Sequence, residues 1–468
     1  MRLKIKVPNT LVLLTVLLVI TAALTLFIPA GEYDRVEKEI NGQKVALVDP
    51  SSFKEIDAAP QFNLNILMAP IKGFMAASEI IVFILFVGGA FYVFQRTEAI
   101  DAGIKALAKA HKSSEFIRRA MIPIFMIIFS LAGATFGMSE ETIPFIMIFI
   151  PLALVLGYDT VTGVAIPFVA ASTGFAAAFL NPFTIGVAQG IAGLPPMSGI
   201  EYRLVIWVIC TAVSIWWVMR YAAKIKKDPK LSITYELDLE RRKDLHMSDL
   251  DDFKGMDTKH KFVLLTFLSG IVVVVFGVLY FGWYIKEICA VFLATGIITG
   301  IVGRLKANEI AESFVAGAKD LISTAFVVAL SKALLIIASD GKIIDTILHA
   351  FSSPLDGLHP IGSSWIMLFV QKIIVFFVPS GSGQAALTMP VMAPLSDILG
   401  VSRQTAVLAF QFGEGFANMI IPTSAVTMGI LTLAKIPYEK WAVWILPLEI
   451  IFIILALILM IPPYFIWQ

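Results

Sequence analysis

Three glutamates are the residues of this chain with the clearest potential for chemistry. Glu140, Glu141 and Glu414 each lie in a short polar or small-residue segment that interrupts a long apolar run. A charged side chain at the centre of a bilayer costs at least about 2.5–3.5 kcal/mol unless it is paired or hydrated, so it is functional by default. The three carboxylates predict a site for a substrate cation. The alternative is that they bind protons or sodium ions and have no part in substrate selection.

Two of these interruptions resemble each other. The first reads F-G-M-S-E-E-T-I-P over residues 136–144, and the second reads V-P-S-G-S-G-Q-A-A-L-T-M-P over 378–390. Polar, flexible backbone at membrane depth is tolerated only where it lines a protein cavity. Small residues also mediate helix packing in membranes, but the run 380–384 favours a turn over a helix face. A matched pair of such segments indicates the binding site of a secondary transporter.

A second pair of breaks follows the first, over residues 174–184 and 414–424. Pro182 and Pro422 each lie in one of them, and a proline inside a helix frees carbonyl groups of the preceding turn. Freed carbonyls together with Asn and Thr side chains can coordinate a cation, while helix N-termini at the two tips suit an anionic group. The alternative is that both prolines only kink their helices.

We therefore expect one site where the two halves of the chain meet. Glu141 or Glu414 would bind a substrate cation or a proton, and the hydroxyl and amide groups of the tips would bind a carboxylate. A coupled sodium ion would lie near Ser139, Asn181, Ser382 and Thr423. The candidate site residues are Gly137, Ser139, Glu140, Glu141, Thr142, Asn181, Pro182, Thr184, Ser380, Gly381, Ser382, Gly383, Gln384, Glu414, Asn418, Pro422, Thr423 and Ser424.

The basic residues limit the choice of substrate. No Lys or Arg lies in either tip, and we expect Lys332 and Lys372 on scaffold helices or hairpin stems and Arg403 at an outer span end. Three carboxylates would repel a dicarboxylate unless they hold cations or protons. A basic amino acid fits more directly, and a dicarboxylate coupled to H⁺ or Na⁺ remains the alternative.

The composition assigns the chain to the membrane. Of its 468 residues 58% are hydrophobic and 15% are charged, whereas soluble domains carry about 25% charged residues. The net charge of +1 gives no indication of nucleic-acid binding, and Cys210 and Cys289 in apolar runs predict neither a disulfide nor a metal site. No His or Asp is placed to activate Ser380 or Ser382, so we expect no enzyme. A channel is a third, weaker interpretation.

The positive-inside rule orients the spans in a bacterial inner membrane. The first apolar segment, 10–29, is too long for a signal peptide and is expected to remain as a span. The N-terminus is then cytoplasmic and the C-terminus outside. The basic segments placed inside are Arg2, Lys4 and Lys6, residues 96–119, residues 224–261, Arg304 with Lys306, and Lys435 with Lys440.

Short matches between the two halves predict an internal repeat. They recur at offsets near 240 to 246 residues, and the second copy would start from the opposite side of the membrane. The matched pairs are Phe74 with Phe314, Ile100 with Ile344, Thr142 with Thr388, Gly157 with Gly400, and Gly174 with Gly415.

The repeat defines an all-α polytopic fold of two inverted halves. The first half, 1–222, has scaffold 1–95, interfacial helix 96–112, re-entrant hairpin 117–157, broken helix 160–190 and helix 202–222. Two full spans are the alternative for 117–157 and for the corresponding segment 361–399, because the charge pattern agrees with either arrangement. A cytoplasmic linker and connecting helix occupy 223–283. The second half, 284–468, has scaffold 284–338, interfacial helix 342–351, hairpin 361–399, broken helix 401–432 and helix 441–462.

The chain resembles the YfcC-like branch of the anaerobic C4-dicarboxylate carrier family over essentially its whole length. The motifs that carry this resemblance are the two tips, N-P-F-T at 181–184 and Q-F-G-E-G-F-A-N-M-I-I-P-T-S at 411–424. The resemblance implies the ion transporter superfamily: inverted repeats, a scaffold, a mobile transport domain, a homodimer and an elevator motion. The superfamily's Ser-Asn-Thr tip motif is replaced here by Met-Ser-Glu-Glu-Thr and Ser-Gly-Ser-Gly-Gln. Members of this branch are described as arginine/ornithine-type antiporters, so the resemblance implies amino acid exchange with no cofactor beyond coupling Na⁺ or H⁺.

Overall fold

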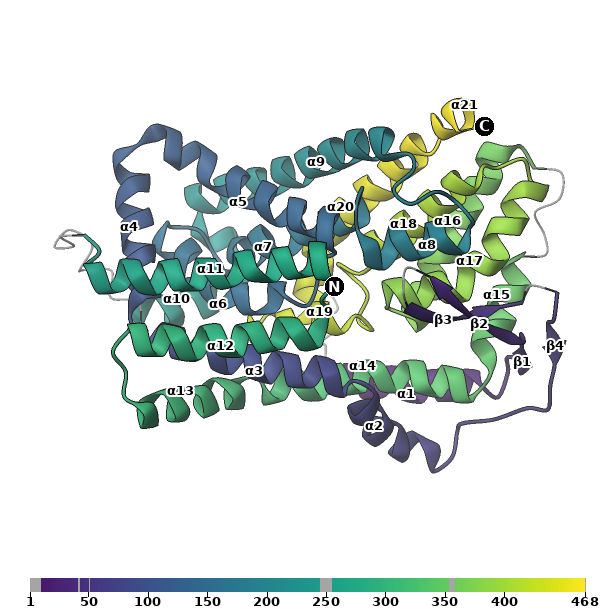
Figure 1. Cartoon of the computed structure of the whole chain (residues 1–468), viewed down its shortest axis with the longest axis horizontal. Helices are drawn as coiled ribbons and strands as arrows, with labels where there is room; N and C mark the ends of the chain where they lie inside the picture. The colour runs from purple at the N-terminus through teal and green to yellow at the C-terminus, as the bar shows by residue number, and fades with distance from the viewer. Residues whose placement is uncertain (1–9, 41–42, 50, 245–254, 353–357, 468) are drawn as a thin grey trace, which may run out of the picture.

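The computed structural model describes residues 10–40, 43–49, 51–244, 255–352 and 358–467. Helices dominate these ranges and run mostly along the long axis of the molecule (Figure 1). The prediction of a purely helical chain is wrong in one segment, because residues 31–55 hold four short strands. Arg2, Lys4 and Lys6, on which the predicted N-terminal orientation depends, lie outside the described residues.

The helices of the first half follow one another with short connections. They are α1 (Thr10–Leu24), α2 (Asn65–Ala76), α3 (Ser78–Arg96), α4 (Ala99–Ser113), α5 (Glu115–Phe136), α6 (Thr142–Val155), α7 (Thr160–Ala176), the π-helix η1 (Pro182–Gly186), α8 (Val187–Ile191) and α9 (Ile200–Lys227). The 3₁₀ turn η2 (Pro229–Leu231) and α10 (Tyr235–Asp244) begin the linker, and α11 (Thr258–Phe281) ends it.

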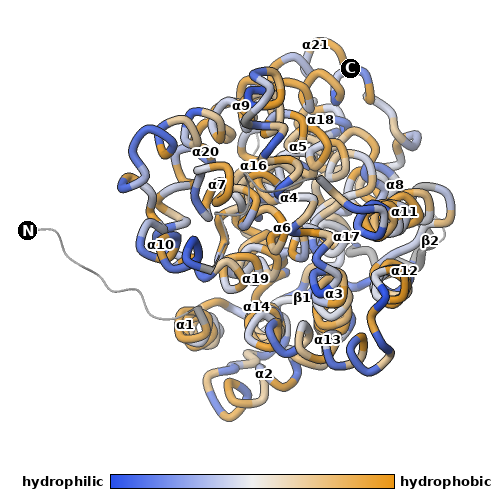
Figure 2. Tube along the Cα trace, turned by 90° about the vertical axis from the view of Figure 1, so that its left-hand side faces the viewer, coloured by the Kyte–Doolittle hydropathy of each residue, from blue (hydrophilic) through white to orange (hydrophobic). Residues whose placement is uncertain are grey.

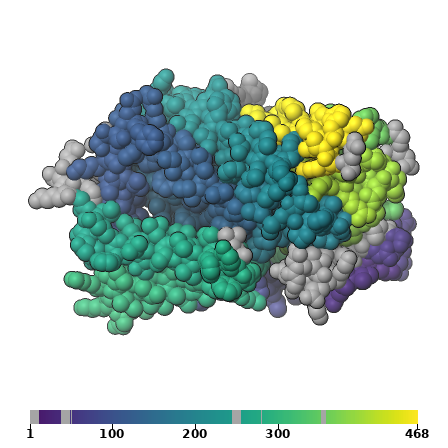
Figure 3. Space-filling view, turned by 45° about the horizontal axis from the view of Figure 1, so that its top comes forward, coloured from purple at the N-terminus to yellow at the C-terminus, as the bar shows by residue number. Residues whose placement is uncertain are grey.

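The second half has a similar series. It comprises α12 (Ile285–Val302), α13 (Ala307–Asp320), α14 (Ile322–Asp340), α15 (Ile343–Ser352), α16 (Pro360–Phe377), α17 (Gly381–Ile398), α18 (Arg403–Ala417), α19 (Ala425–Leu433), α20 (Tyr438–Leu459) and α21 (Pro463–Ile466). The segments α11 to α13 form a layer along one side of α4 to α9 (Figure 3).

Eight described helices are long and apolar enough to cross a membrane. The hydropathy-coloured trace in Figure 2 shows most helices in the hydrophobic colour, whereas α10 is hydrophilic. Many side chains on the outer surface of the bundle are large and apolar, for example Leu265, Val272 and Val443. Such exposure suits contact with lipid, so the chain is a multi-pass membrane protein.

Two pairs of consecutive helices, α2 with α3 and α13 with α14, each form one long helix with a single interruption, and the two long helices pack against each other. α2 and α3 meet at Ala77, and α13 and α14 meet at Leu321. α2 lies against α14, and α3 lies against α13 and α12. Glycines allow this approach, since a Cβ atom on Gly317 would lie 2.5 Å from the carbonyl oxygen of Gly88. Small residues are the usual means of bringing membrane helices together.

The remaining core is built from two helix pairs, each packed on the helix that follows it. α5 and α6 both contact α7, and α16 and α17 both contact α18. The side chain of Gln384 holds the second pair together, donating from Nε2 to the carbonyl oxygen (2.9 Å) and Oε1 (2.7 Å) of Gln371. A buried ion pair between Lys372 and Glu449 joins α16 to α20. Lys372 therefore lies on α16, the first helix of the second pair.

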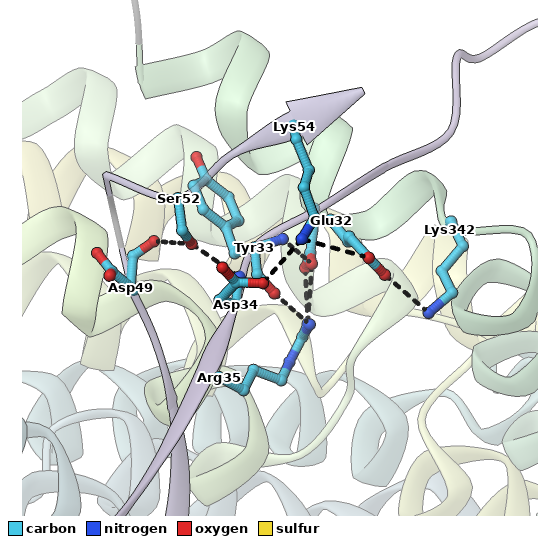
Figure 4. A network of polar contacts seen from close by, with 9 residues as sticks. Glu32, Tyr33, Asp34, Arg35, Asp49, Ser52, Lys54 and Lys342 are labelled. Carbon is cyan, nitrogen blue, oxygen red and sulfur yellow. Dashed lines mark hydrogen bonds and ion pairs between the residues drawn. The ribbon is translucent and has the colours of Figure 1, made fainter. Parts of the chain in front are cut away.

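The strands fasten the 31–55 segment to α15. β1 (Gly31–Glu32) pairs antiparallel with β4 (Lys54–Glu55), and β2 (Arg35–Ile40) pairs antiparallel with β3 (Gln43–Val48). Arg35 donates from Nη2 to both carboxylate oxygens of Asp345 at 2.9 Å, and Lys54 and Lys342 both pair with Glu32 (Figure 4). The strand segment and α15 are thus joined by charged and main-chain contacts.

α10 fastens the linker to both halves. Asp238 accepts hydrogen bonds from the main-chain nitrogen and the hydroxyl of Thr160, and burial raises its pKa. Arg241 donates to the hydroxyl of Thr160 (2.8 Å) and to the carbonyl oxygen of Ala434 (3.0 Å). The linker therefore holds the start of α7 to the end of α19.

Candidate functional site

A central cavity of about 170 Å³ lies where the interrupted segments meet. One water molecule needs about 10–15 Å³ by this measure, so the space suits a small organic molecule better than a single ion. The lining residues are Ala77, Ile80, Phe136, Gly137, Ser139, Glu140, Glu141, Phe168, Ser172, Phe175, Phe183, Thr184, Val278, Tyr284, Ile285, Ile288, Val328, Ser331, Lys332, Leu335, Pro379, Ser380, Gly381, Ser382, Glu414, Asn418, Thr423, Ser424, Ala425 and Val426.

The first tip, residues 137–141, reverses the chain between α5 and α6. Gly137 ends α5 with φ of +74°, and a Cβ atom there would lie 2.8 Å from Oδ1 of Asn181. Only glycine satisfies both the left-handed conformation and the close approach. The main-chain nitrogen of Ser139 donates to Oε2 of Glu141 (3.0 Å), which holds that carboxylate at the tip.

The first broken helix has a polar residue at its centre. α7 ends at Ala176, and Asn181 then caps η1 by accepting hydrogen bonds at Oδ1 from the main-chain nitrogens of Phe183 (2.9 Å) and Thr184 (3.3 Å). Phe179 and Leu180 donate from the main chain to the carbonyl oxygen of Ala134. Asn181 thus positions the chain that carries Thr184 into the cavity.

The second tip is shorter than the sequence indicated. α16 ends at Phe377, and α17 begins at Gly381 after Val378, Pro379 and Ser380. The prediction that Ser380–Gln384 form a turn is therefore wrong, because Gly381 to Gln384 make the first turn of α17. The reason is that Gln384 bonds to Gln371 across the hairpin, which stabilises helix at that point.

The second broken helix carries the buried carboxylate. α18 ends at Ala417, and Asn418 donates from Nδ2 to Oε1 of Glu414 (2.7 Å). Glu414 is 1% exposed. Ser424 then caps α19 by accepting from the main-chain nitrogen of Thr427 (3.4 Å). The segment between these helices presents Thr423 and Ser424 to the cavity.

The two broken helices cross directly beside the cavity. A Cβ atom on Gly415 would lie 2.6 Å from Cβ of Ala176, so the α7 and α18 backbones touch. Gln411 donates from Nε2 to the carbonyl oxygen of Phe175 (2.5 Å). Residues more than 230 positions apart in the chain therefore form one wall, as the repeat-based prediction of a shared site requires.

The structure brings twelve of the candidate residues to the cavity and leaves six behind it. Those at the cavity are Gly137, Ser139, Glu140, Glu141, Thr184, Ser380, Gly381, Ser382, Glu414, Asn418, Thr423 and Ser424; those behind it are Thr142, Asn181, Pro182, Gly383, Gln384 and Pro422. Thr142 donates to the carbonyl oxygen of Ser139, and Pro182 is the first residue of η1. The residues behind the cavity shape the tips and breaks without facing the space.

Sequence reasoning missed one charged residue. Lys332 of α14 lines the cavity, although it was expected only as a scaffold or stem residue. Its neighbours in the lining are Val328, Ser331 and Leu335. The spacing i, i+3, i+4 and i+7 is one face of a helix, so the periodicity of α14 could have identified this face. Tyr284, beside Phe183 with ring centroids 4.9 Å apart, was also missed.

Several polar atoms at the site have no partner within the described part of the chain. They include Oγ1 of Thr184 and Thr423, Oε2 of Glu414 and Nδ2 of Asn181, all of them buried. Buried polar atoms are normally satisfied by protein, water or a ligand. Three of these four atoms are oxygens, which can coordinate a cation or accept a hydrogen bond from a ligand.

Three of the four residues predicted to bind sodium lie around this cavity. Ser139, Ser382 and Thr423 line the cavity, whereas Asn181 lies behind it. Within the described residues no cluster of three or more His, Cys, Asp or Glu side chains could hold a metal ion. Sodium binding remains a prediction from the hydroxyl and carboxylate oxygens.

Comparisons with known proteins find one carrier family and two similar bacterial proteins. A family model described as DcuC, C4-dicarboxylate anaerobic carrier, matches residues 7–464. A protein of Escherichia coli (strain K12) named "Putative basic amino acid antiporter YfcC" is 37% identical over 93% of this chain and 92% of its own length. An uncharacterized protein of Haemophilus influenzae is 31% identical over 86% of this chain and 79% of its own length.

Two solved transporter structures are distantly similar. The YdaH transporter of Alcanivorax borkumensis aligns with a TM-score of 0.43 and 14% identity over 97% of this chain and 98% of that one. MtrF of Neisseria gonorrhoeae aligns with a TM-score of 0.42 and 15% identity over 97% of this chain and 95% of that one.

Proposed function

The chain belongs to the C4-dicarboxylate anaerobic carrier family, and from this premise we propose that it is a secondary active transporter that exchanges basic amino acids such as arginine and ornithine. The observation that carries the proposal is the meeting of Glu140, Glu141 and Glu414 at one cavity. All three carboxylates line the same space of about 170 Å³. Such a cluster favours a cationic ligand over an anionic one.

The two ends of an amino acid would be bound by different groups. The side-chain cation would be bound by Glu141 or Glu414, and the α-carboxylate by hydroxyls and main-chain nitrogens at the second tip. α17 begins there at Gly381 without a side-chain cap on Ser380. An uncapped helix N-terminus offers free N–H groups and partial positive charge. Na⁺ or H⁺ would serve as a coupling ion at the carboxylates and the hydroxyls of Ser139, Ser382 and Thr423.

The order of the helices supports two inverted repeats and an elevator motion. The series α2 to α9 and α13 to α20 contain the same sequence of elements, and the reciprocal packing of α2 on α14 and α3 on α13 supports an internal two-fold relationship. In this proposal α1 to α3 and α12 to α14 form the scaffold. The hairpins and broken helices α5 to α8 and α16 to α19 move, with α4 and α15 as connecting arms.

The wider setting of the proposal comes from the family resemblance and the charge pattern. The protein would work as a homodimer in the bacterial inner membrane, with its N-terminus in the cytoplasm and its C-terminus outside. The hairpins would be re-entrant and reach the middle of the bilayer. Inverted-repeat carriers place their substrate sites at this depth, where the two repeats meet.

A C4-dicarboxylate is the second candidate substrate. Lys332 favours it, because a lysine ammonium at the cavity could bind a carboxylate. The family description favours it too. A dicarboxylate would enter beside three glutamates only together with protons or sodium ions.

Uptake into proteoliposomes tests the proposal. Purified protein is reconstituted, and uptake of radiolabelled arginine is compared between vesicles loaded with ornithine and vesicles loaded with buffer. Stimulation by internal ornithine is expected, with no competition by unlabelled C4-dicarboxylates. Uptake of succinate or fumarate without uptake of arginine would replace the proposal with the dicarboxylate alternative.

A further inference from the structure

Lys332 occupies the face of α14 that borders the central cavity. Val328, Ser331 and Leu335 share this face. The neighbouring face of the same helix is closed by α2, since a Cβ atom on Gly73 would lie 3.0 Å from the main-chain nitrogen of Ala333. Lys332 is half-buried and therefore lies between the contact with α2 and the cavity that it lines.

Lys332 shares the cavity with three glutamates but forms an ion pair with none of them in the described chain. No ion pair or hydrogen bond joins its ammonium group to the parts of the chain that the structure describes. Lys372 of α16, by contrast, is paired with Glu449. A half-buried cation without a partner costs free energy, so we infer that an anion binds beside Lys332.

Lys332 lies near the second tip. Leu335, one turn further along α14, lines the central cavity and also an adjacent pocket. Val378 and Gly383, on either side of the second tip, line that adjacent pocket with it. The Lys332 face and the N-terminus of α17 therefore border the same cavity, and Leu335 connects that face to the pocket beside the second tip. Both contribute positive charge, whereas the three glutamates contribute negative charge.

We propose that Lys332 binds the carboxylate of the transported substrate and so makes the carrier specific for amino acids over the corresponding amines. The inference rests on the proposed exchange of basic amino acids and adds a residue from the scaffold helix to their recognition. Lys332 and the tip of α17 would hold the carboxylate, while Glu141 or Glu414 holds the side-chain cation. A guanidinium compound that lacks the carboxylate would make only the second contact.

Ligand-induced thermal stabilisation of the purified protein tests the assignment without requiring transport. Arginine and its decarboxylated analogue agmatine are titrated against the wild type, Lys332→Met, Lys332→Arg and the control Lys319→Met, which changes an exposed lysine of α13. Ligand binding raises the melting temperature according to concentration and Kd. We expect Lys332→Met to weaken arginine binding by about 10- to 100-fold, as loss of a charge-assisted hydrogen bond does.

Agmatine binding shows whether Lys332 recognises the substrate carboxylate or is needed for folding. Agmatine binding should be unchanged in Lys332→Met, Lys332→Arg should recover part of the arginine affinity, and Lys319→Met should match the wild type. Unchanged arginine affinity in Lys332→Met, or an equal loss for arginine and agmatine, would overturn the assignment.

The same titrations separate this inference from the proposed function. A wild type stabilised by succinate and not by arginine would reject amino acid exchange, and Lys332 would then be judged by whether Lys332→Met loses succinate binding. A wild type stabilised by neither ligand would overturn both statements.

Discussion

Asn418 and Glu414 form a hydrogen-bonded pair one helical turn apart, with Nδ2 of Asn418 2.7 Å from Oε1 of Glu414. The same Nδ2 atom lies 3.1 Å from the carbonyl oxygen of Glu414. α18 ends where this pair forms, so the amide both closes the helix and orients the carboxylate. The other carboxylate oxygen, Oε2, has no partner in the described residues and is available to a ligand.

Removing this amide should impair transport more than folding. Asn418→Ala leaves Glu414 buried without its donor, and loss of a hydrogen bond to a charged group costs about 1.5–3 kcal/mol. We expect arginine–ornithine exchange to fall by at least about tenfold. The measurement is the initial exchange rate in proteoliposomes. An exchange rate equal to that of the wild type would mean that Glu414 needs no orientation by Asn418.

Neutralising the carboxylate of the first tip should abolish exchange. Glu141→Gln keeps the size of the side chain and its capacity to accept from Ser139, but it removes the charge that would bind a cation. Uptake is the measurement, with expression and melting temperature expected to remain near those of the wild type. The matched control is Glu115→Gln, at an exposed ion pair with Arg119 outside the cavity. Wild-type uptake by Glu141→Gln would remove its assigned role.

Gly137 should tolerate alanine less well than Gly157 does. Both have positive φ, but a Cβ atom on Gly137 would lie 2.8 Å from Asn181, whereas Gly157 has no atom within 4 Å. Alanine in the left-handed conformation costs about 1–2 kcal/mol, and the contact with Asn181 adds a cost of similar size. Melting temperatures should therefore fall further for Gly137→Ala than for Gly157→Ala. Equal losses would show that the first tip moves away from Asn181.

The contacts of α10 should stabilise the whole molecule. Arg241→Ala removes donors to Thr160 and to the carbonyl oxygen of Ala434, at an expected cost of about 1–3 kcal/mol. The melting temperature of the purified protein reports this loss. Lys243→Ala, an exposed change in the same helix, is the control and should have no effect. If both variants melt with the wild type, α10 is a passive connection.

Much of this architecture follows from hydrophobic runs and the residues that interrupt them. The first tip was located by Gly137 to Glu141, and the helices expected at 96–112 and 342–351 form as α4 and α15 with only small changes in bounds. Their position at the membrane interface stays a prediction. These features depend on local signals, namely glycine at a reversal and a change of hydrophobic period.

Features set by contacts between distant residues were harder to predict. Gln384 becomes helical because Gln371 accepts its hydrogen bonds, and no pattern near residue 384 reveals that partner. The strands of 31–55 form against α15, about 300 positions away in the chain. Lys332 reaches the cavity because α14 presents one face to it, and sequence reasoning searched the interruptions and not the continuous helices.

Because Arg35 is bonded to Asp345, the strand segment can report on the position of α15. α15 connects α14 to α16, so any displacement of the second hairpin relative to α14 must shift the strands with α15 or break this pair. If the displacement breaks the pair, an antibody fragment that recognises residues 31–35 and α15 together would bind the conformation with the intact pair in preference to the other. Such a fragment would hold the protein in a single shape for imaging and would act as an inhibitor without entering the central cavity.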